Sequence, residues 1–227
     1  MKVILPVMLI FLITSCWKDK NPLFDGINCS SNCFVLTGKL IDSASNSGIA
    51  GGEIKFYFAN TSGVFTNRRN FLGSAVTDAN GIYSFKFDGG RFSNVRGYYV
   101  ADAYKNDMFA DPLYEHRVAV FYLDSSKYNQ PYIQDLPLFH PATIKVRVVA
   151  TTVTNFQYLT VSYSFGMSGS GIVFNGSRNI DTTIIWKTAG NLRTFIQADA
   201  VGNGVNIQKR DTIFIPINGS RQVEIKL

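Results

Sequence analysis

Charge, histidine and long apolar runs are all scarce in this sequence. Only 17% of its 227 residues are charged, and it has two histidines and three cysteines. Its longest apolar run, at residues 3–13, is shorter than the roughly 20 residues that a membrane-spanning helix needs. Because 46% of the residues are hydrophobic, the composition also excludes an intrinsically disordered chain. We therefore expect folded domains and no transmembrane helix.

The basic residues lack the clustering that nucleic-acid binding requires. The formal net charge is +6 and the isoelectric point is about 9.2. The basic residues nevertheless gather only in isolated pairs, at 68–69 and 209–210, whereas a nucleic-acid footprint is a dense patch or stripe. This mild excess of positive charge fits weak attraction to acidic lipids or polysaccharides. We expect no nucleic-acid partner.

Catalytic and cofactor motifs are missing as well. A serine hydrolase needs a G-x-S-x-G nucleophile elbow, and the sequence has none. Residues 166–171, GMSGSG, differ from it in spacing and are not followed by a helical pattern, so we expect a flexible hairpin loop there and no phosphate cradle. The two histidines, His116 and His140, show no metal-ligand spacing. The sequence predicts a protein that is not an enzyme, with no metal and no cofactor.

The densest group of polar residues lies in the loop from Asp102 to Arg117. Clustered loop charges are usually solvent-exposed, which is the first interpretation. A binding loop with Asp107 and Asp111 as calcium ligands is one alternative, although calcium loops space their acidic residues more tightly. A hydrolase with two carboxylates from this loop is the other. The group consists of Asp102, Asp107, Asp111, Glu115, His116 and Arg117.

The N-terminus has the pattern of an export signal that ends at a cysteine. A lysine precedes the apolar run, and Thr14 and Ser15 lead into Cys16. This pattern resembles a bacterial lipobox, which predicts a signal peptide at residues 1–15 and lipidation of Cys16 by diacylglycerol and an acyl chain such as palmitate. These lipids anchor a protein without a membrane-spanning helix. Trp17, in place of the aspartate of inner-membrane retention signals, favours the outer membrane; the periplasmic and the cell-surface face both stay open.

The remaining cysteines lie in a polar segment. Residues 16–33 contain glycine, asparagine, serine and charged residues, and we expect a lipidated tether. If Cys16 carries lipid, Cys29 and Cys33 remain as an even pair in an oxidising compartment, which favours a disulfide between them. Free thiols are the alternative. A metal site would need further ligands at suitable spacing, and none follow.

From residue 34 onward the sequence is typical of β-strands separated by turns. β-Branched and aromatic residues fill short segments, with Gly, Asn, Asp and Pro between them. Ile54, Phe56 and Phe58 recur every second residue, the period of a half-buried strand. Residues 78–81, DANG, are expected to form a hairpin turn. The first domain, residues 34–139, is predicted to have strands at 34–41, 53–59, 72–77, 82–87, 98–104, 117–123 and 133–138, with an irregular loop at 105–116.

A second domain, residues 140–227, is predicted after the prolines that flank His140. Residues 143–150 begin a fresh alternation of apolar and basic side chains. About seven strands at this spacing indicate a second β-sandwich, which we describe as Ig-like on pattern alone. The predicted fold is therefore all-β, with two consecutive β-sandwich domains and little helix. The predicted strands lie at 143–150, 158–165, 171–175, 181–187, 192–198, 212–216 and 222–227.

The first domain resembles the carboxypeptidase regulatory-like family. The similarity covers residues 34–139 and rests on TGKLID at 37–42, GIAGGEI at 48–54, TDANGIY at 77–83 and DLPL at 135–138. The resemblance implies a transthyretin-like (prealbumin-type) β-sandwich. It also implies a non-catalytic module of an exported bacterial protein, such as those found beside receptors and carbohydrate-handling enzymes.

Aromatic residues are abundant and supply the candidate binding residues. Tyr57, Tyr99 and Tyr104 are predicted to face outward, where tyrosine rings can stack on sugars or on a protein partner. Partial burial at sheet edges is the alternative interpretation. The combined expectation is a membrane-anchored envelope lipoprotein that acts as a binding, adhesion or scaffold module for an envelope protein or polysaccharide. The alternatives are a carbohydrate-binding accessory of a glycan-uptake system and a hydrolase that uses the loop from Asp102 to Arg117.

Overall fold

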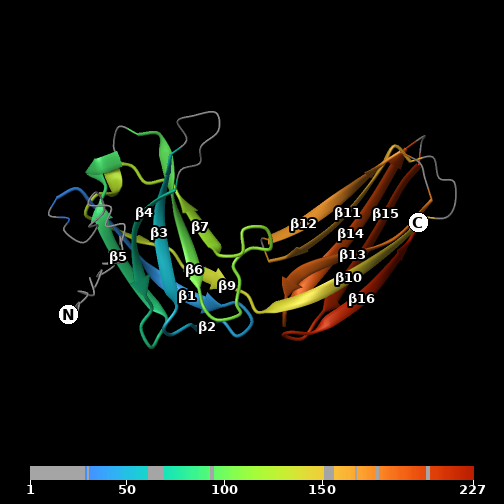
Figure 1. The fold of residues 1–227 in the computed structure, drawn as a ribbon, viewed down its shortest axis with the longest axis horizontal. Helices are drawn as coiled ribbons and strands as arrows, with labels where there is room; N and C mark the ends of the chain where they lie inside the picture. The colour runs from blue at the N-terminus through green and yellow to red at the C-terminus, as the bar shows by residue number, and fades with distance from the viewer. Residues whose placement is uncertain are drawn as a thin grey trace, which may run out of the picture.

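The structure is a computed structural model, and it is an all-β protein with two sandwiches in succession, as the sequence predicts (Figure 1). The predicted signal peptide, Cys16 and most of the predicted tether lie outside the described residues. Within the described part, no helix is long and apolar enough to cross a bilayer. The structure describes residue 29 and residues 31–60, 69–92, 95–150, 156–166, 168–176, 179–202 and 205–227.

The first sandwich packs a five-stranded sheet on a four-stranded sheet. Two short 3-10 helices, Gly90–Phe92 and Ser125–Lys127, lie in its connections. The five-stranded sheet contains β1 (Cys33–Asp42), β2 (Ser47–Gly48), β5 (Ile82–Asp88), β8 (Pro131–Ile133) and β9 (Leu136–Leu138), and the other contains β3 (Glu53–Asn60), β4 (Arg69–Val76), β6 (Gly97–Tyr104) and β7 (Arg117–Phe121).

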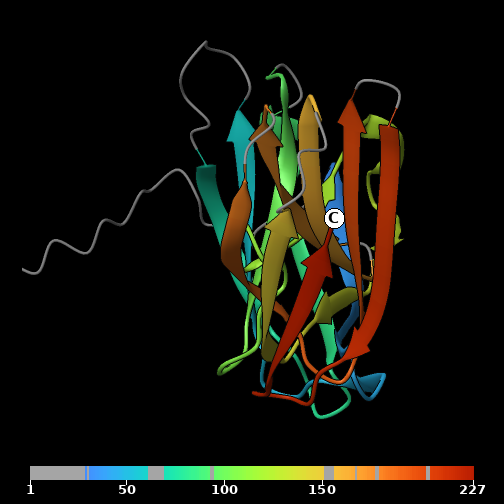
Figure 2. The same ribbon diagram turned by 90° about the vertical axis from the view of Figure 1, so that its right-hand side faces the viewer.

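The second sandwich has sheets of three and four strands. Figure 2, seen from the side of this sandwich, shows the strands of its two sheets running in about the same direction, the aligned packing of twisted sheets. The smaller sheet contains β10 (Pro141–Ala150), β13 (Ile180–Ala189) and β16 (Ser220–Lys226), and the larger contains β11 (Tyr158–Phe165), β12 (Ser168–Asn175), β14 (Arg193–Gly202) and β15 (Val205–Phe214).

Both sandwiches use one strand order. The first strand of each, β1 or β10, is antiparallel to β5 or β13 and parallel to the last strand, which is β8 with β9 or β16. The other sheets have the orders β4-β3-β6-β7 and β12-β11-β14-β15. In an immunoglobulin constant domain the first strand instead lies beside the second. The second sandwich therefore shares its seven strands in two sheets with Ig-like domains, and its strand pairing with the first sandwich.

Each sandwich has its own apolar cluster between its sheets. Ile54, Phe56 and Phe58 of β3 are buried as their alternation predicts. A fully buried side chain of this size contributes about 1.5–3 kcal/mol. Phe109 and Phe139 belong to the second cluster although both precede β10, and Phe109 lies 6.0 Å from Phe165 between ring centroids. Two aromatic rings from the segments before β10 thus pack into the second sandwich.

The segments that carry the family resemblance interlock within the first sandwich. A Cβ atom at Gly38 would overlap the carbonyl oxygen of Gln134, so only glycine lets the chain cross there between β8 and β9. The backbone N–H of Lys39 donates to Asp135 (2.8 Å), and the hydroxyl of Tyr83 donates to the carbonyl of Gln134 (2.7 Å). These contacts join β1 and β5 to the segment between β8 and β9, the closing strands of this sandwich.

Two predicted turns differ from the structure. Residues 78–81 do not close a hairpin, because β4 belongs to the four-stranded sheet and β5 pairs with β1 in the other. Asp78 still organises this turn, accepting hydrogen bonds from the N–H groups of Asn80 and Ile82 (both 2.8 Å). The predicted loop at 166–171 is largely strand, since Ser168 to Gly171 already pair with β11.

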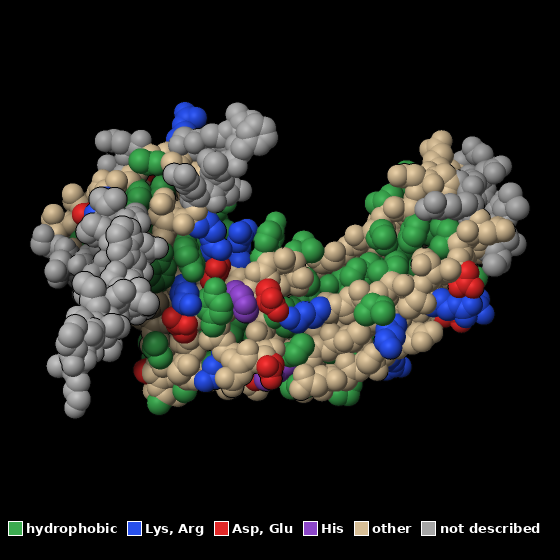
Figure 3. All heavy atoms as spheres, viewed as in Figure 1, with side chains coloured by type: hydrophobic (Ala, Val, Ile, Leu, Met, Phe, Trp, Pro, Cys, Tyr) green, Lys and Arg blue, Asp and Glu red, His purple; other side chains and the backbone are tan. Residues whose placement is uncertain are grey.

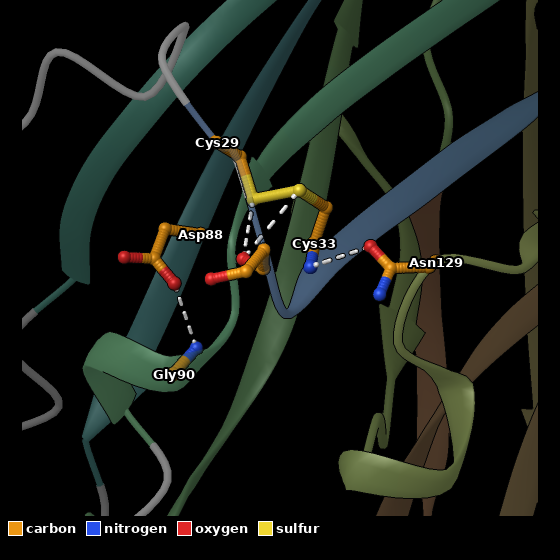
Figure 4. Close-up of a disulfide and its surroundings, with 6 residues drawn as sticks. Cys29, Cys33, Asp88, Gly90 and Asn129 are labelled. Atoms are coloured by element: carbon orange, nitrogen blue, oxygen red, sulfur yellow. Dashed lines mark hydrogen bonds between the residues drawn. A yellow bond between two sulfur atoms is a disulfide. The ribbon is translucent and has the colours of Figure 1, made fainter.

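A disulfide between Cys29 and Cys33 lies where the chain enters β1 (Figure 4). This is the pairing that the sequence favours. Cys33 is 1% exposed, and its N–H donates to the side-chain oxygen of Asn129 (3.2 Å). The N–H of Asn129 donates in return to the carbonyl of Cys33 (2.6 Å). The first residue of β1 is therefore held by a covalent link on one side and by Asn129 on the other.

Candidate functional site

The candidate site is the outward face of the β4-β3-β6-β7 sheet. Along β3, the residues that alternate with the buried Phe56 and Phe58 are Lys55 and Tyr57. Glu53 lies opposite Tyr104 and Lys55 opposite Asp102 in the antiparallel register, and opposed residues share a face. Figure 3 shows basic, acidic, hydrophobic and histidine side chains meeting in the middle of the molecule, where the first sandwich adjoins the second.

An ion pair spans three strands of this face. Arg69 of β4 donates to the Asp102 carboxylate of β6 at 2.7 Å, and its guanidinium lies 4.2 Å from the ring centroid of Tyr57 on β3. The side chain of Asp102 is 7% exposed, whereas that of Arg69 is 32% exposed. A buried carboxylate is costly unless it is paired. Arg69 therefore compensates for the burial of Asp102, and its guanidinium also contacts the ring of Tyr57.

Tyr104 lies at the centre of a second group. Lys55 Nζ is 4.7 Å from the centroid of its ring, and the His116 ring is 4.3 Å away between centroids. Burial raises the pKa of Tyr104 and the pKa of Tyr57, and the negative charge of Asp102 raises both further. Both phenols therefore keep their protons at neutral pH and can donate hydrogen bonds.

The loop before β7 adds a second cation on an aromatic ring. Arg117 lies 4.2 Å from the centroid of Tyr114, whose side chain is exposed. Asp111 accepts from the N–H groups of Leu113 (2.8 Å) and Tyr114 (3.0 Å), so this carboxylate shapes the turn that presents Tyr114. Asp107 is exposed. Among the described residues, no group of three or more His, Cys, Asp or Glu side chains could hold a metal ion.

Three buried polar atoms on this face have no hydrogen-bond partner. They are Asp102 Oδ1, His116 Nδ1 and Arg117 Nε, and within the described ranges no other buried side-chain nitrogen or oxygen is left unsatisfied. Asp102 of β6 and Arg117 of β7 lie opposite each other in the strand register, next to a register shift after Ala101. Buried polar atoms are nearly always hydrogen-bonded to protein or to water, so three exceptions in one place single out this part of the face as the candidate site.

One predicted site residue is wrong and several were missed. Tyr99 is 6% exposed and packs between Phe34, Phe58 and Phe87 in the first core. The period of two could have excluded it, because Tyr99 and Tyr104 are an odd number of residues apart on one strand and face opposite sides. The missed members of the face are Lys55, Arg69, Phe71, Tyr98, Tyr114 and Tyr122.

Comparisons with known proteins give the chain no family. No protein-family model matches the sequence, and a search of curated proteins finds no match. Among solved structures, the shaft pilin SpaA from Lactobacillus rhamnosus GG is similar at 10% identity and a TM-score of 0.31, over 87% of this chain and 98% of the pilin. A DUF3823 family protein from Parabacteroides merdae is similar at 9% identity and a TM-score of 0.29, over 81% and 99%.

Other similar structures are much longer than the matched region. A 9R-lipoxygenase from Cyanothece matches at 17% identity and a TM-score of 0.33, over 47% of this chain and only 16% of the enzyme. The chain likewise spans 34% of the Bacillus anthracis TIE protein. Similarity at this level carries no argument about function.

Proposed function

We propose that the protein is a non-catalytic, lipid-anchored recognition module of the bacterial outer membrane. The anchor is the predicted lipid on Cys16, and the setting follows from the resemblance of residues 34–139 to the carboxypeptidase regulatory-like family. The observation that carries the proposal is the outward face of the β4-β3-β6-β7 sheet. Aromatic and guanidinium groups are enriched at recognition surfaces, and here they are gathered and ordered before any partner arrives.

The carboxylates of the loop support binding over hydrolysis. A glycosidase needs two carboxyl groups that both face one bond. Asp102 is tied to Arg69, Asp111 shapes its own turn, and Glu115 accepts from Lys187 of the second sandwich at 3.0 Å. Each of these three carboxylates therefore has a structural partner, which favours binding over hydrolysis.

The anchor is tested by metabolic labelling with palmitate. The full-length chain should incorporate the label in a bacterial host, and Cys16→Ala should abolish it. Labelling that persists in Cys16→Ala would refute the anchor.

The recognition face is tested by crosslinking in intact envelopes. The full-length chain should capture a partner, and Tyr114→Ala, which changes an exposed side chain of the face, should reduce capture several-fold. Phe195→Ala is the matched control, because Phe195 is an exposed ring of the second sandwich. Equal capture by both variants would refute a role for this face.

A further inference from the structure

We propose that the outward face of the β4-β3-β6-β7 sheet binds an acidic carbohydrate, a polysaccharide whose sugars carry carboxylate groups. The inference rests on the proposed function and names the ligand class of that face. Three features point to this chemistry: two guanidinium groups seated on tyrosine rings, an arginine with no acidic partner among the described residues, and unpartnered donors and acceptors on the same face.

The seated guanidinium groups suit a carboxylate. Arg69 lies on Tyr57 and Arg117 on Tyr114, each at 4.2 Å from the ring centroid. A planar guanidinium binds a carboxylate through two parallel N–H donors, and stacking on a ring fixes its plane in advance. The exposed Tyr114 ring also offers apolar surface against which a sugar ring can pack.

The charges of the face leave one cation without an acid. Glu53 lies 3.4 Å from Lys55, and Asp102 lies 2.7 Å from Arg69. Arg117 makes no ion pair with any residue in the described ranges. The chain as a whole carries a net charge of +6. An anionic ligand therefore meets a complementary surface, and its binding will weaken as salt screens exposed charges.

The unpartnered atoms distinguish a sugar from a simple anion. Asp102 Oδ1 can only accept a hydrogen bond, Arg117 Nε can only donate one, and His116 Nδ1 does either according to its protonation. A sulfate or a phosphodiester group supplies acceptors alone and leaves Asp102 unmatched. A sugar acid supplies hydroxyl donors beside its carboxylate. It can meet both needs through a bridging water while Arg69 and Arg117 keep their positions.

The test is calorimetry on the full-length protein in detergent micelles. The probes are polygalacturonate, alginate and hyaluronate, each compared with its methyl ester, which removes the charge and keeps the sugar. At least one acid form should bind, with its ester about ten-fold weaker, and raising salt from 0.05 to 0.5 M should weaken binding further. No binding to any of the three, or equal binding of acid and ester, would overturn the inference.

Variants assign the binding to the face. Arg117→Gln and Tyr114→Ala should each weaken binding about ten-fold, and Arg117→Lys should be intermediate because it keeps the charge and loses the planar fork. Arg147→Gln, at an exposed arginine of the second sandwich, is the control. Thermal unfolding checks that each variant is folded. If Arg117→Gln and Arg147→Gln lose affinity equally, the polysaccharide is attracted by the net positive charge of the chain and not by this face, which would contradict the inference. If the crosslinking experiment captures a protein through this face and no polysaccharide binds, this inference fails and the proposed function stands.

Discussion

The two sandwiches of this chain build different surfaces on the same strand order. Strands β3 and β6 of the first correspond to β11 and β14 of the second in sheet position. The outward residues of the first pair include Lys55, Tyr57 and Asp102, whereas Ser162 of β11 lies opposite Gln197 of β14. The inward residues are apolar in both, apart from the buried Thr194 of β14. The two sandwiches therefore share a strand order and buried inner faces, while their outward positions differ.

The closing strands differ too. In the first sandwich the last strand is split into β8 and β9, where Gln134 crosses over Gly38. In the second, β16 pairs with β10 without a break from Ser220 to Lys226. Tyr132 of β8 packs against Phe121 of β7 in the facing sheet, with 5.8 Å between ring centroids. The first sandwich thus depends on a glycine and on local contacts that the second does not need.

The largest expected loss of stability comes from a substitution at Gly38, where Gln134 crosses over β1. Gly38→Ala places a methyl group against the carbonyl of Gln134, and the strain should destabilise the first sandwich by about 3 kcal/mol. Hydrogen exchange followed by mass spectrometry should show faster exchange in β1, β8 and β9 and little change in β10. Lys145→Ala, at an exposed position of β10, is the control. Stability equal to the wild type in Gly38→Ala would contradict this role of the crossing.

Reduction of the disulfide should have the next largest effect. Cys29 and Cys33 are separated by four positions, and removing so short a crosslink costs about 2 kcal/mol through the entropy of the unfolded chain. The second sandwich contains no cysteine. Thermal unfolding with and without a reductant should therefore shift only the transition of the first sandwich. A shift of both transitions would mean that the two sandwiches unfold as one unit.

Buried tyrosines should make both sandwiches sensitive to alkali. The hydroxyl of Tyr163 donates to the carbonyl of Lys187 (2.7 Å), as Tyr83 does to Gln134. Burial raises the pKa of Tyr163 from 10.0 to about 12, and it raises the pKa of Tyr83 further. The folded state then holds a proton that the unfolded state releases above pH 10. The stabilisation is complete below pH 10 and is lost as the pH rises toward 12.

Tyr163→Phe should lower the free energy of unfolding by about 1 kcal/mol at neutral pH. It should also reduce the loss of stability between pH 10 and pH 12, because the group that titrates is gone. Fluorescence of Trp186, whose ring lies 4.8 Å from Tyr163 between centroids, reports unfolding of the second sandwich when Trp17 is replaced by Phe. An alkaline profile identical to that of the wild type would contradict the assignment. Tyr83→Phe, which leaves the second sandwich unchanged, is the matched control.

The smallest expected effect is on the contact between the sandwiches. Glu115 and Lys187 are paired at 3.0 Å with side chains 63% and 38% exposed, and such surface pairs contribute a few tenths of a kcal/mol. The hydrogen bond and charge of Lys187 lower the pKa of Glu115 from 4.5. The contribution is therefore present above pH 4.5 and lost as the pH falls below it. A double-mutant cycle with Glu115→Gln and Lys187→Gln measures it, and a coupling above 1 kcal/mol would contradict this size.

The sequence predicts inward alternation well and long-range pairing poorly. Phe56, Tyr83 and Phe85 are buried where the period of two places them, because their neighbours along the strand decide this. The turn at residues 78–81 has the composition of a hairpin, yet it connects two sheets. A turn satisfies its own hydrogen bonds in either case, and only the distant partners of β4 and β5 tell the two apart.

The candidate site was predictable only in part. Tyr57 and Tyr104 follow from alternation on β3 and β6. The ion pair of Arg69 with Asp102 joins residues 33 positions apart and depends on which strands become neighbours. Phe109 belongs to a segment with a loop-like composition and nevertheless enters the core of the other sandwich. Local sequence carries no signal for either contact.

The position of the disulfide has a mechanical consequence. A pull on the chain ahead of Cys29 reaches the first sandwich at Cys33, the first residue of β1, and the crosslink prevents the segment between the two cysteines from extending. β1 is bonded to β5 on one side and to β8 and β9 on the other. Tension along β1 loads these hydrogen bonds together in shear, instead of opening them one after another. A pull on the segment before Cys29 is thus borne first by β1 and by the three strands bonded to it.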